Sequence, residues 1–395
     1  MSTPHRLPVG AALPVLLSAG LLLTACGTGQ EQAATEADGQ GNEAVSVNNP
    51  LVTTYDGGLY VLDGDTLEVE RDIELEGFNR INPAGDDRHL FVSTSEGFQL
   101  LDAAAGVLTD DLIAADAPGH VVRHAGRTVL FADGSGEVTL LDSDALGEGL
   151  PEEPEQYTAE EPHHGVAVEL SNGELLVTLG DEEERVGVAV LDADREEITR
   201  NEECPGVHGE TVAAGETVVI GCEDGVLTYR DGELTKIDSP DEYGRIGNQA
   251  GSEESPVVLG DYKTDPDAEL ERPERVALLD TEEADLTLVD LPSSYTFRSL
   301  GIGPDGEALV LGTDGILHVI DTETAEVVDG IEVTDAWEEP LEWQDARPAL
   351  FVRDTTAYVS DPATRQIHAV DLATGEITAS VTLDEAPNEL SGVAH

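Results

Sequence analysis

Three of the ten histidines recur at a fixed spacing. His120, His164 and His208 are separated by 44 and 44 residues, and each opens the first predicted strand of a consecutive unit. If these strands are equivalent parts of a repeat, the three imidazoles converge on one place. Imidazole nitrogen is a preferred ligand of Zn²⁺, which binds it at about 2.0–2.1 Å and usually takes four ligands. The spacing therefore predicts a zinc site made by these three side chains.

Two further histidines are candidate ligands of the same ion. His163 directly precedes the second of the three, and His124 follows the first by four residues, which in a strand would place it on the same face. The candidates for the fourth ligand are these two side chains, a carboxylate such as Glu210 or Glu254, and water. Copper(II) and nickel(II) also accept imidazole, so residue types alone do not select zinc.

Short apolar strands that end in Asp recur along the chain and indicate the repeating unit. Their Asp residues are spaced by 39, 40, 50, 39, 49, 41 and 50 residues, and no long amphipathic helix pattern interrupts them. Such a period, with Gly-containing turns before the strands, is typical of an all-β propeller. Eight such Asp residues predict eight blades, with seven blades as the alternative. These residues are Asp63, Asp102, Asp142, Asp192, Asp231, Asp280, Asp321 and Asp371.

The two ends of the repeat region each lack part of a unit. Residues 50–55 enter without an obvious innermost strand, whereas residues 388–395 look like an innermost strand without its blade. We therefore expect the two ends to pair and close one propeller domain over residues 49–395, because pairing removes a free sheet edge. The first strand of each propeller blade lines the central channel, so the three histidines would meet near one of its mouths.

The cysteines predict one disulfide bond. Only Cys204 and Cys222 remain after Cys26, and their midpoint lies beside a predicted hairpin turn at residues 214–216. That hairpin would place the two side chains opposite each other, and an oxidising location would join them. Two unpaired buried thiols are the alternative. Because Cys204 lies four residues before His208, a bridge would hold the loop that presents this candidate ligand.

The N-terminal 25 residues predict a lipoprotein signal peptide. Arg6 is the only charged side chain in residues 1–25, and the apolar run that follows is too short for an ordinary transmembrane helix. The run ends in a lipobox-like pattern, so Cys26 is the expected lipidation site, with a plain secretory signal as the alternative. Residues 26–48 have little to bury and predict a disordered linker. The sequence thus predicts an exported protein, lipid-anchored to the outer face of a bacterial membrane.

The charge balance excludes several partners. The 395 residues carry 83 Asp+Glu against 19 Lys+Arg, a formal net charge of −64. Nucleic acid is excluded, because counterion-release binding needs clustered basic residues. An anionic membrane surface is a poor partner for the folded part, so membrane contact is expected only through the lipid. We expect a monomer.

Several segments resemble the AztD-type zinc metallochaperones, exported propeller proteins associated with a zinc ABC transporter. The resemblance runs from about residue 49 to residue 393 and is carried by residues 49–52, 119–124, 162–167, 204–210, 247–254 and 388–393. It implies a propeller that captures zinc outside the cytoplasm and passes it to the zinc-specific solute-binding protein of the transporter. Some relatives have a His-rich N-terminal segment, but residues 27–48 here contain no His.

Three functions are consistent with these residues. The first is a non-enzymatic zinc carrier that holds Zn²⁺ with neutral imidazoles and releases it by ligand exchange in a docked complex. The second is a metal-dependent hydrolase or lactonase that uses the same histidines, an open water position and Glu210 or Glu254 as the base. The third is a metal-free scaffold that binds proteins at its rim. The resemblance favours the first, which needs no catalytic residue.

Overall fold

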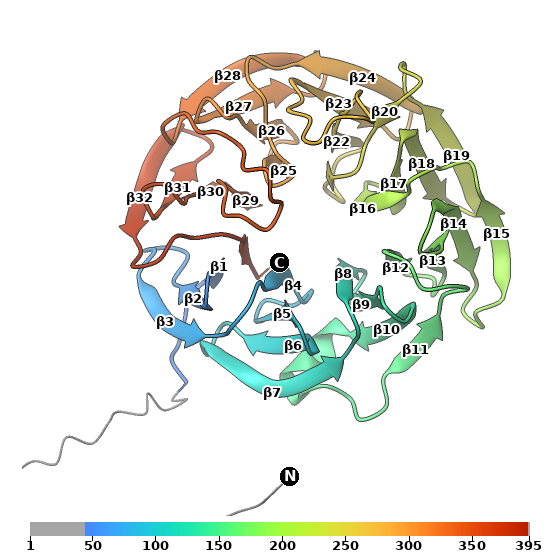
Figure 1. Ribbon diagram of the computed structural model, residues 1–395, viewed down its shortest axis with the longest axis horizontal. Helices are drawn as coiled ribbons and strands as arrows, with labels where there is room; N and C mark the ends of the chain where they lie inside the picture. The colour runs from blue at the N-terminus through green and yellow to red at the C-terminus, as the bar shows by residue number, and fades with distance from the viewer. Residues whose placement is uncertain (1–43, 394–395) are drawn as a thin grey trace, which may run out of the picture. The chain divides into compact units, whose positions relative to one another are not determined.

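Eight antiparallel sheets form the blades of a ring in the computed structural model, which describes residues 44–393 (Figure 1). The all-β propeller with eight blades is confirmed, and the seven-bladed alternative is wrong. The predicted signal peptide, Cys26 with its lipidation, and most of the predicted linker lie outside the described residues. No helix among residues 44–393 is long and apolar enough to cross a membrane.

Each blade has four strands, which are given from the channel outward. Blade 1 contains β33 (Leu390–Gly392), β1 (Leu51–Tyr55), β2 (Gly58–Leu62) and β3 (Val69–Glu74), and blade 2 contains β4 (Arg80–Pro83), β5 (His89–Thr94), β6 (Gly97–Asp102) and β7 (Val107–Ala114). Blade 3 contains β8 (Pro118–His124), β9 (Arg127–Ala132), β10 (Glu137–Asp142) and β11 (Glu155–Thr158), and blade 4 contains β12 (Ala167–Glu169), β13 (Leu175–Gly180), β14 (Arg185–Leu191) and β15 (Glu197–Asn201).

The remaining blades follow the same order. Blade 5 contains β16 (His208–Ala213), β17 (Thr217–Cys222), β18 (Asp224–Arg230) and β19 (Glu233–Asp238), and blade 6 contains β21 (Gln249–Ala250), β22 (Val257–Asp261), β23 (Arg275–Asp280) and β24 (Asp285–Asp290). Blade 7 contains β25 (Leu300–Ile302), β26 (Ala308–Leu311), β27 (Ile316–Asp321) and β28 (Glu326–Glu332), and blade 8 contains β29 (Leu350–Arg353), β30 (Thr356–Asp361), β31 (Gln366–Asp371) and β32 (Glu376–Thr382). A short strand, β20 (Gly244–Arg245), adds to β18 in parallel, and a 3-10 helix, η1 (Ser143–Glu148), follows β10.

The hydrophobic core is divided among the interfaces between neighbouring blades. The middle strands are buried on both faces, as in β5 and β17, where every residue is buried. The cluster between blades 4 and 5, for example, packs Val168, Leu176 and Val190 against Val218 and Ile220. Each such side chain contributes about 1.5–3 kcal/mol by leaving water. Two-sided burial explains why these strands are continuous apolar runs and not alternating ones.

The recurring Asp residues end the third strand of a blade or directly follow it, as Asp63, Asp192 and Asp231 do, and begin the turn to the outermost strand. In seven of the eight, the carboxylate accepts hydrogen bonds from backbone N–H groups two to four residues further on, which is the Asx-turn pattern. Asp231 is the exception and lies in a tight turn with a φ of 51°. The other Asp residues that predicted the repeat therefore stabilise the turns between the third and fourth strands through hydrogen bonds to the backbone.

The ring is closed by the two ends of the chain, as predicted. β33 pairs antiparallel with β1, with Leu51 opposite Gly392, and the guanidinium of Arg353 donates to the carbonyl of Pro50 at 2.9 Å. Packed structure begins earlier than expected, because the N–H groups of Val45 and Val47 donate to blade 2 carbonyls at 2.9 Å. The last four residues of the predicted linker, 45–48, are thus attached to the propeller.

The innermost strands surround a central cavity of about 710 Å³. Every connection from an outermost strand to the next innermost strand lies on the same face of the ring, because each blade repeats one meander. We call this the entry face. It positions the candidate site, since residues that begin innermost strands, or precede them, all lie there.

Candidate metal centre

The three periodic histidines come from consecutive blades and meet at the entry face. His120 is the third residue of β8, and His208 is the first residue of β16. His164 lies in the connection from β11 to β12, three residues before that strand begins, and so is not itself on a strand. The predicted register is therefore approximate, but it does bring the three side chains together.

The imidazole rings are close enough to share one metal ion. Their ring centroids are 5.1 Å (His120–His164), 5.5 Å (His120–His208) and 5.0 Å (His164–His208) apart. One ligand atom from each lies within 4.8 Å of the other two. Among residues 44–393 no fourth His, Cys, Asp or Glu joins this group. The geometry provides three nitrogen ligands and leaves a fourth position open.

An oxygen atom faces Nδ1 of each ring. Asp133 Oδ2 lies 2.5 Å from Nδ1 of His164, and the carbonyl oxygen of Gly247 lies 2.7 Å from Nδ1 of His208. Glu210 Oε2 lies 3.3 Å from Nδ1 of His120. A carbonyl or carboxylate accepts a hydrogen bond from Nδ1–H, which leaves the Nε2 lone pair free. Acceptors of this kind fix the tautomer of metal-binding histidines.

The Nε2 atoms of His164 and His208 face each other at 3.0 Å. With both Nδ1 atoms protonated and both rings neutral, two lone pairs face one another, and either a proton or a metal ion between them removes the repulsion. Two nitrogen ligands of tetrahedral zinc are separated by roughly 3.3 Å when the Zn–N bonds are about 2.0–2.1 Å. Burial lowers the pKa of His208 well below 6.5, and the charge of His120 lowers it further, so this ring is neutral, as a metal ligand must be.

Two glycines make room for the acceptors. Gly209 has a φ of +73° in the irregular pairing that follows His208, and a Cβ there would lie 2.4 Å from the Gly247 carbonyl oxygen. A Cβ on Gly119 would lie 2.1 Å from Oδ1 of Asp133. The local sequences Gly119-His120 and His208-Gly209 therefore allow the hydrogen-bond acceptors to approach the site closely.

The other two predicted ligands do not join the group. His163 is buried, with Nδ1 donating to the Glu161 carbonyl at 2.9 Å and Nε2 accepting from the Thr178 hydroxyl at 2.9 Å, so neither nitrogen is free. His124 ends β8, away from the entry face, and its ring lies between Glu216 (2.7 Å) and Glu253 (2.8 Å). Neither side chain therefore belongs to the group among residues 44–393 that could hold a metal ion, and both link neighbouring elements.

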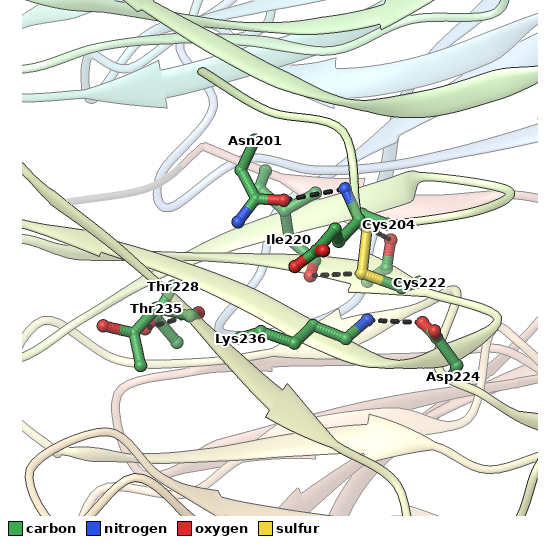
Figure 2. The surroundings of a disulfide bond; sticks show 10 residues. Asn201, Cys204, Ile220, Cys222, Asp224, Thr228, Thr235 and Lys236 are labelled. Atoms are coloured by element: carbon green, nitrogen blue, oxygen red, sulfur yellow. Dashed lines mark hydrogen bonds and ion pairs between the residues drawn. A yellow bond between two sulfur atoms is a disulfide. The ribbon is translucent and has the colours of Figure 1, made fainter. Parts of the chain in front are cut away.

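The predicted disulfide between Cys204 and Cys222 is present (Figure 2). The Cα atoms are 4.9 Å apart and both side chains are fully buried. Ala213 pairs with Thr217 across the predicted hairpin, but Cys204 lies in the connection before β16 and not on a strand. The bridge attaches this connection to the end of β17, four residues before His208.

The site opens into a cleft of about 650 Å³ on the entry face. His164 and His208 line it together with the exposed loop of residues 181–184 and two arginines, Arg185 and Arg245. The side chain of His164 is 42% exposed, so a ligand from solution or from another protein has access to this ring. Glu254, a candidate base or ligand, lines the central cavity instead.

Sequence reasoning missed two groups that hold the histidines. Asp133 lies in the Asp-Gly turn between β9 and β10, where such a residue reads only as a turn former. The Gly247 contact is made by a backbone carbonyl, which has no side-chain signature. Only the Gly residues next to the histidines hinted at a close approach of backbone or side chains.

Comparison with known proteins finds similarity to a protein named as a zinc chaperone, although no family model matches the chain. The zinc chaperone AztD of Citrobacter koseri is 26% identical over 286 residues, which cover 70% of this chain and 65% of that protein. The chain resembles AztD. This confirms the resemblance inferred from the sequence, with the match spanning 65% of the relative's length.

Solved structures agree on the fold. Two crystal structures of Citrobacter koseri AztD, one of them of the apo protein, superpose with a TM-score of 0.75 at 22% identity, covering 87% of this chain and 96% of that one. A dihydro-heme d1 dehydrogenase, NirN, superposes with a TM-score of 0.59 at 12% identity, over 89% of this chain and 77% of NirN. At these identities the likeness shows a shared propeller fold.

Proposed function

We propose that this protein is a zinc metallochaperone that binds Zn²⁺ with His120, His164 and His208 and passes it to the solute-binding protein of a zinc ABC transporter. The observation that carries the proposal is the convergence of three imidazoles whose Nδ1 atoms each face an oxygen. The similarity to a protein named zinc chaperone supports the choice of metal and of function.

The geometry suits a carrier better than a permanent site. Structural zinc sites are closed by four protein ligands, whereas three ligands leave one coordination position for an incoming group. Here that position faces a cleft, and the ring of His164 is 42% exposed. A receiving protein can therefore add its own ligand before the histidines release the ion, which avoids slow free dissociation.

The hydrolase alternative has less support. It needs a free base beside the metal, but Glu210 lies at 3.3 Å from Nδ1 of His120, and Glu254 lines the central cavity. The similar protein is named as a chaperone, whereas the dehydrogenase shares only the fold. We therefore assign a non-enzymatic function.

The cellular location belongs to the same proposal. An export signal, lipidation at Cys26 and a tether would hold the propeller outside the cytoplasmic membrane, where zinc enters the transporter. The disulfide between Cys204 and Cys222 supports this, because such bridges persist in oxidising compartments. The protein would act as a monomer.

The test is metal stoichiometry and affinity of the mature protein, measured by elemental analysis and by competition with a chromophoric chelator. We expect one tightly bound Zn²⁺ at this site, lost in His208→Ala and kept in the neighbouring control His163→Asn. Mixing the zinc-loaded protein with the solute-binding protein in excess chelator then tests transfer, since directly transferred zinc escapes the chelator. Unchanged tight binding in His208→Ala would refute the site.

A further inference from the structure

Two arginines line the entry-face cleft beside the candidate zinc site, and neither forms an ion pair within residues 44–393. Arg185 begins β14 and Arg245 belongs to β20, and both line the cleft together with His164 and His208. No carboxylate of residues 44–393 lies within 4.0 Å of either guanidinium group. Most other arginines among residues 44–393 form an ion pair, as Arg275 does with Asp290 at 2.9 Å, although Arg123, Arg353 and Arg365 do not. With 83 acidic and 19 basic residues available, two unpaired arginines in one cleft need an explanation.

The two guanidinium groups line the same cleft and carry the same charge. Burial lowers the pKa of Arg185 and the charge of Arg245 lowers it further, while the carboxylates of Glu223 and Asp133 oppose that shift without forming an ion pair. The Nη1 atom of Arg185 is buried and has no hydrogen-bond partner. A buried donor without a partner costs about 1–3 kcal/mol, and the like charge of Arg245 adds to that cost. An anion bound between the groups would remove both costs.

We propose that Arg185 and Arg245 bind a carboxylate group in the cleft, next to a zinc ion held by the three histidines. The inference rests on the proposed zinc site and adds the chemical class of its fourth ligand. A carboxylate fits because the guanidinium fork matches a planar pair of oxygens, and because zinc accepts carboxylate oxygen alongside imidazole nitrogen. The carboxylate comes either from an Asp or Glu side chain of the receiving protein or from a small organic acid in solution.

The exposed acidic loop of residues 181–184 does not prevent this binding. All four side chains are exposed to solvent, where water and salt weaken their repulsion of an incoming anion. The guanidinium groups are partly buried, and their hydrogen bonds act at contact distance. The loop thus opposes the approach of free anions more than it opposes the contact itself.

The experiment uses the mature protein loaded with Co²⁺, whose visible spectrum reports on the fourth ligand, and titrates it with acetate. We expect a spectral change in the wild type and an acetate dissociation constant raised about tenfold, which is about 1.4 kcal/mol, in Arg185→Gln and in Arg245→Gln. Arg275→Gln is the matched control, since its side chain lies outside the cleft. Thermal unfolding checks that each variant is folded, and Arg185→Lys, which keeps the charge, should recover part of the acetate affinity.

A second arm separates the two sources of the carboxylate. A short peptide with one Glu is compared with the same peptide carrying Gln. If the Glu peptide binds more tightly than acetate, the carboxylate comes from a partner protein. If acetate binds as tightly as the Glu peptide, the carboxylate comes from a free acid. Both results support the proposed site. Equal acetate affinity in the wild type and both Gln variants, with Co²⁺ still bound, overturns this inference alone. A protein that binds neither Co²⁺ nor Zn²⁺ overturns the proposed function first.

Discussion

The carboxylate of Asp133 should control how tightly zinc is held, although it touches no metal. Its Oδ2 lies 2.5 Å from Nδ1 of His164, and its Oδ1 lies 3.4 Å from the N–H of Gly165. The substitution Asp133→Asn keeps the shape and an acceptor oxygen but removes the negative charge behind the ligand. We expect weaker zinc binding with little loss of folding stability.

The magnitude follows from the distance between the carboxylate and the ion. Across the ring, a zinc ion on Nε2 would lie about 6 Å from this charge if the Zn–N bond is about 2.0–2.1 Å. The attraction between a unit negative charge and Zn²⁺ at that distance is about 1.4 kcal/mol in water and about 5.5 kcal/mol at an effective dielectric constant of about 20. Because the His164 side chain is 42% exposed, the lower end applies. The affinity should fall between about tenfold and a hundredfold, as is common for groups behind metal ligands.

The assay is competition with a zinc-binding chromophore at about pH 8, where histidines are neutral. Asp329→Asn is the matched control, because it removes the same charge from an exposed position on the outermost strand β28. If Asp133→Asn binds zinc within about twofold of the control, while His208→Ala has lost binding, then the carboxylate does not act through His164. The derived range of about tenfold to a hundredfold would then be refuted.

Four further predictions test the structure around the site. Gly209→Ala, at φ +73° and 2.4 Å from a carbonyl, should lower the melting temperature and the zinc affinity more than Gly232→Ala, which has φ +85° but open space; equal effects would contradict a specific clash. Loss of the disulfide in a Cys204→Ala/Cys222→Ala variant should lower the free energy of unfolding by about 3 kcal/mol in chemical denaturation, and no loss would argue against a constrained connection. His124→Gln should lower that free energy by about 0.5–1.5 kcal/mol, the net value of a hydrogen bond, since Glu216 keeps its bonds from Ser171 and Glu253 is exposed to water. It should leave zinc affinity unchanged, and a large affinity loss would place His124 in the site. Because the folded-state pKa of His208 lies well below 6.5, a proton does not compete with zinc for this ring near neutral pH. As the pH is lowered, the measured zinc affinity should therefore fall by at most about two log units per pH unit, and a slope near three would refute a neutral His208. The stability of the metal-free protein should decline as the pH drops below 6.5, where the unfolded chain takes up the proton first.

The blades could be predicted because their signal is local and repeated. An Asp such as Asp321 ends an apolar strand and accepts N–H groups of its own turn at 3.0 and 2.8 Å, so sequence and structure coincide within a few residues. The paired ends were predictable for a related reason, since each end lacked the part that the other supplied. The start of packed structure was not, because Val45 and Val47 hydrogen-bond to blade 2 through their backbone and add only two isolated valines to its core, outside any repeat.

The site was predictable only as far as the repeat extends to it. Equal spacing identified His120, His164 and His208, because equivalent positions of consecutive blades meet at the channel mouth. His124 does not join the group because four residues of extended strand place it roughly 13 Å from His120, at the end of β8 away from the entry face. His163 does not join it because its two ring nitrogens contact Glu161 and Thr178. Asp133 reaches His164 from another blade, which no local pattern encodes.

The acceptors behind the histidines show why the site depends on the whole ring. His120 in blade 3 faces Glu210 of blade 5, and His164 before blade 4 faces Asp133 of blade 3. Each contact therefore joins different blades, so the orientation of every ligand depends on how the blades pack. Zinc binding at such a site must stabilise the packed ring, by an amount that rises with zinc concentration relative to the dissociation constant. The net charge of −64 does not supply this coupling, because exposed carboxylates attract any cation and are screened by salt. Under the proposed function, selectivity comes from three imidazole nitrogens whose positions the closed propeller defines.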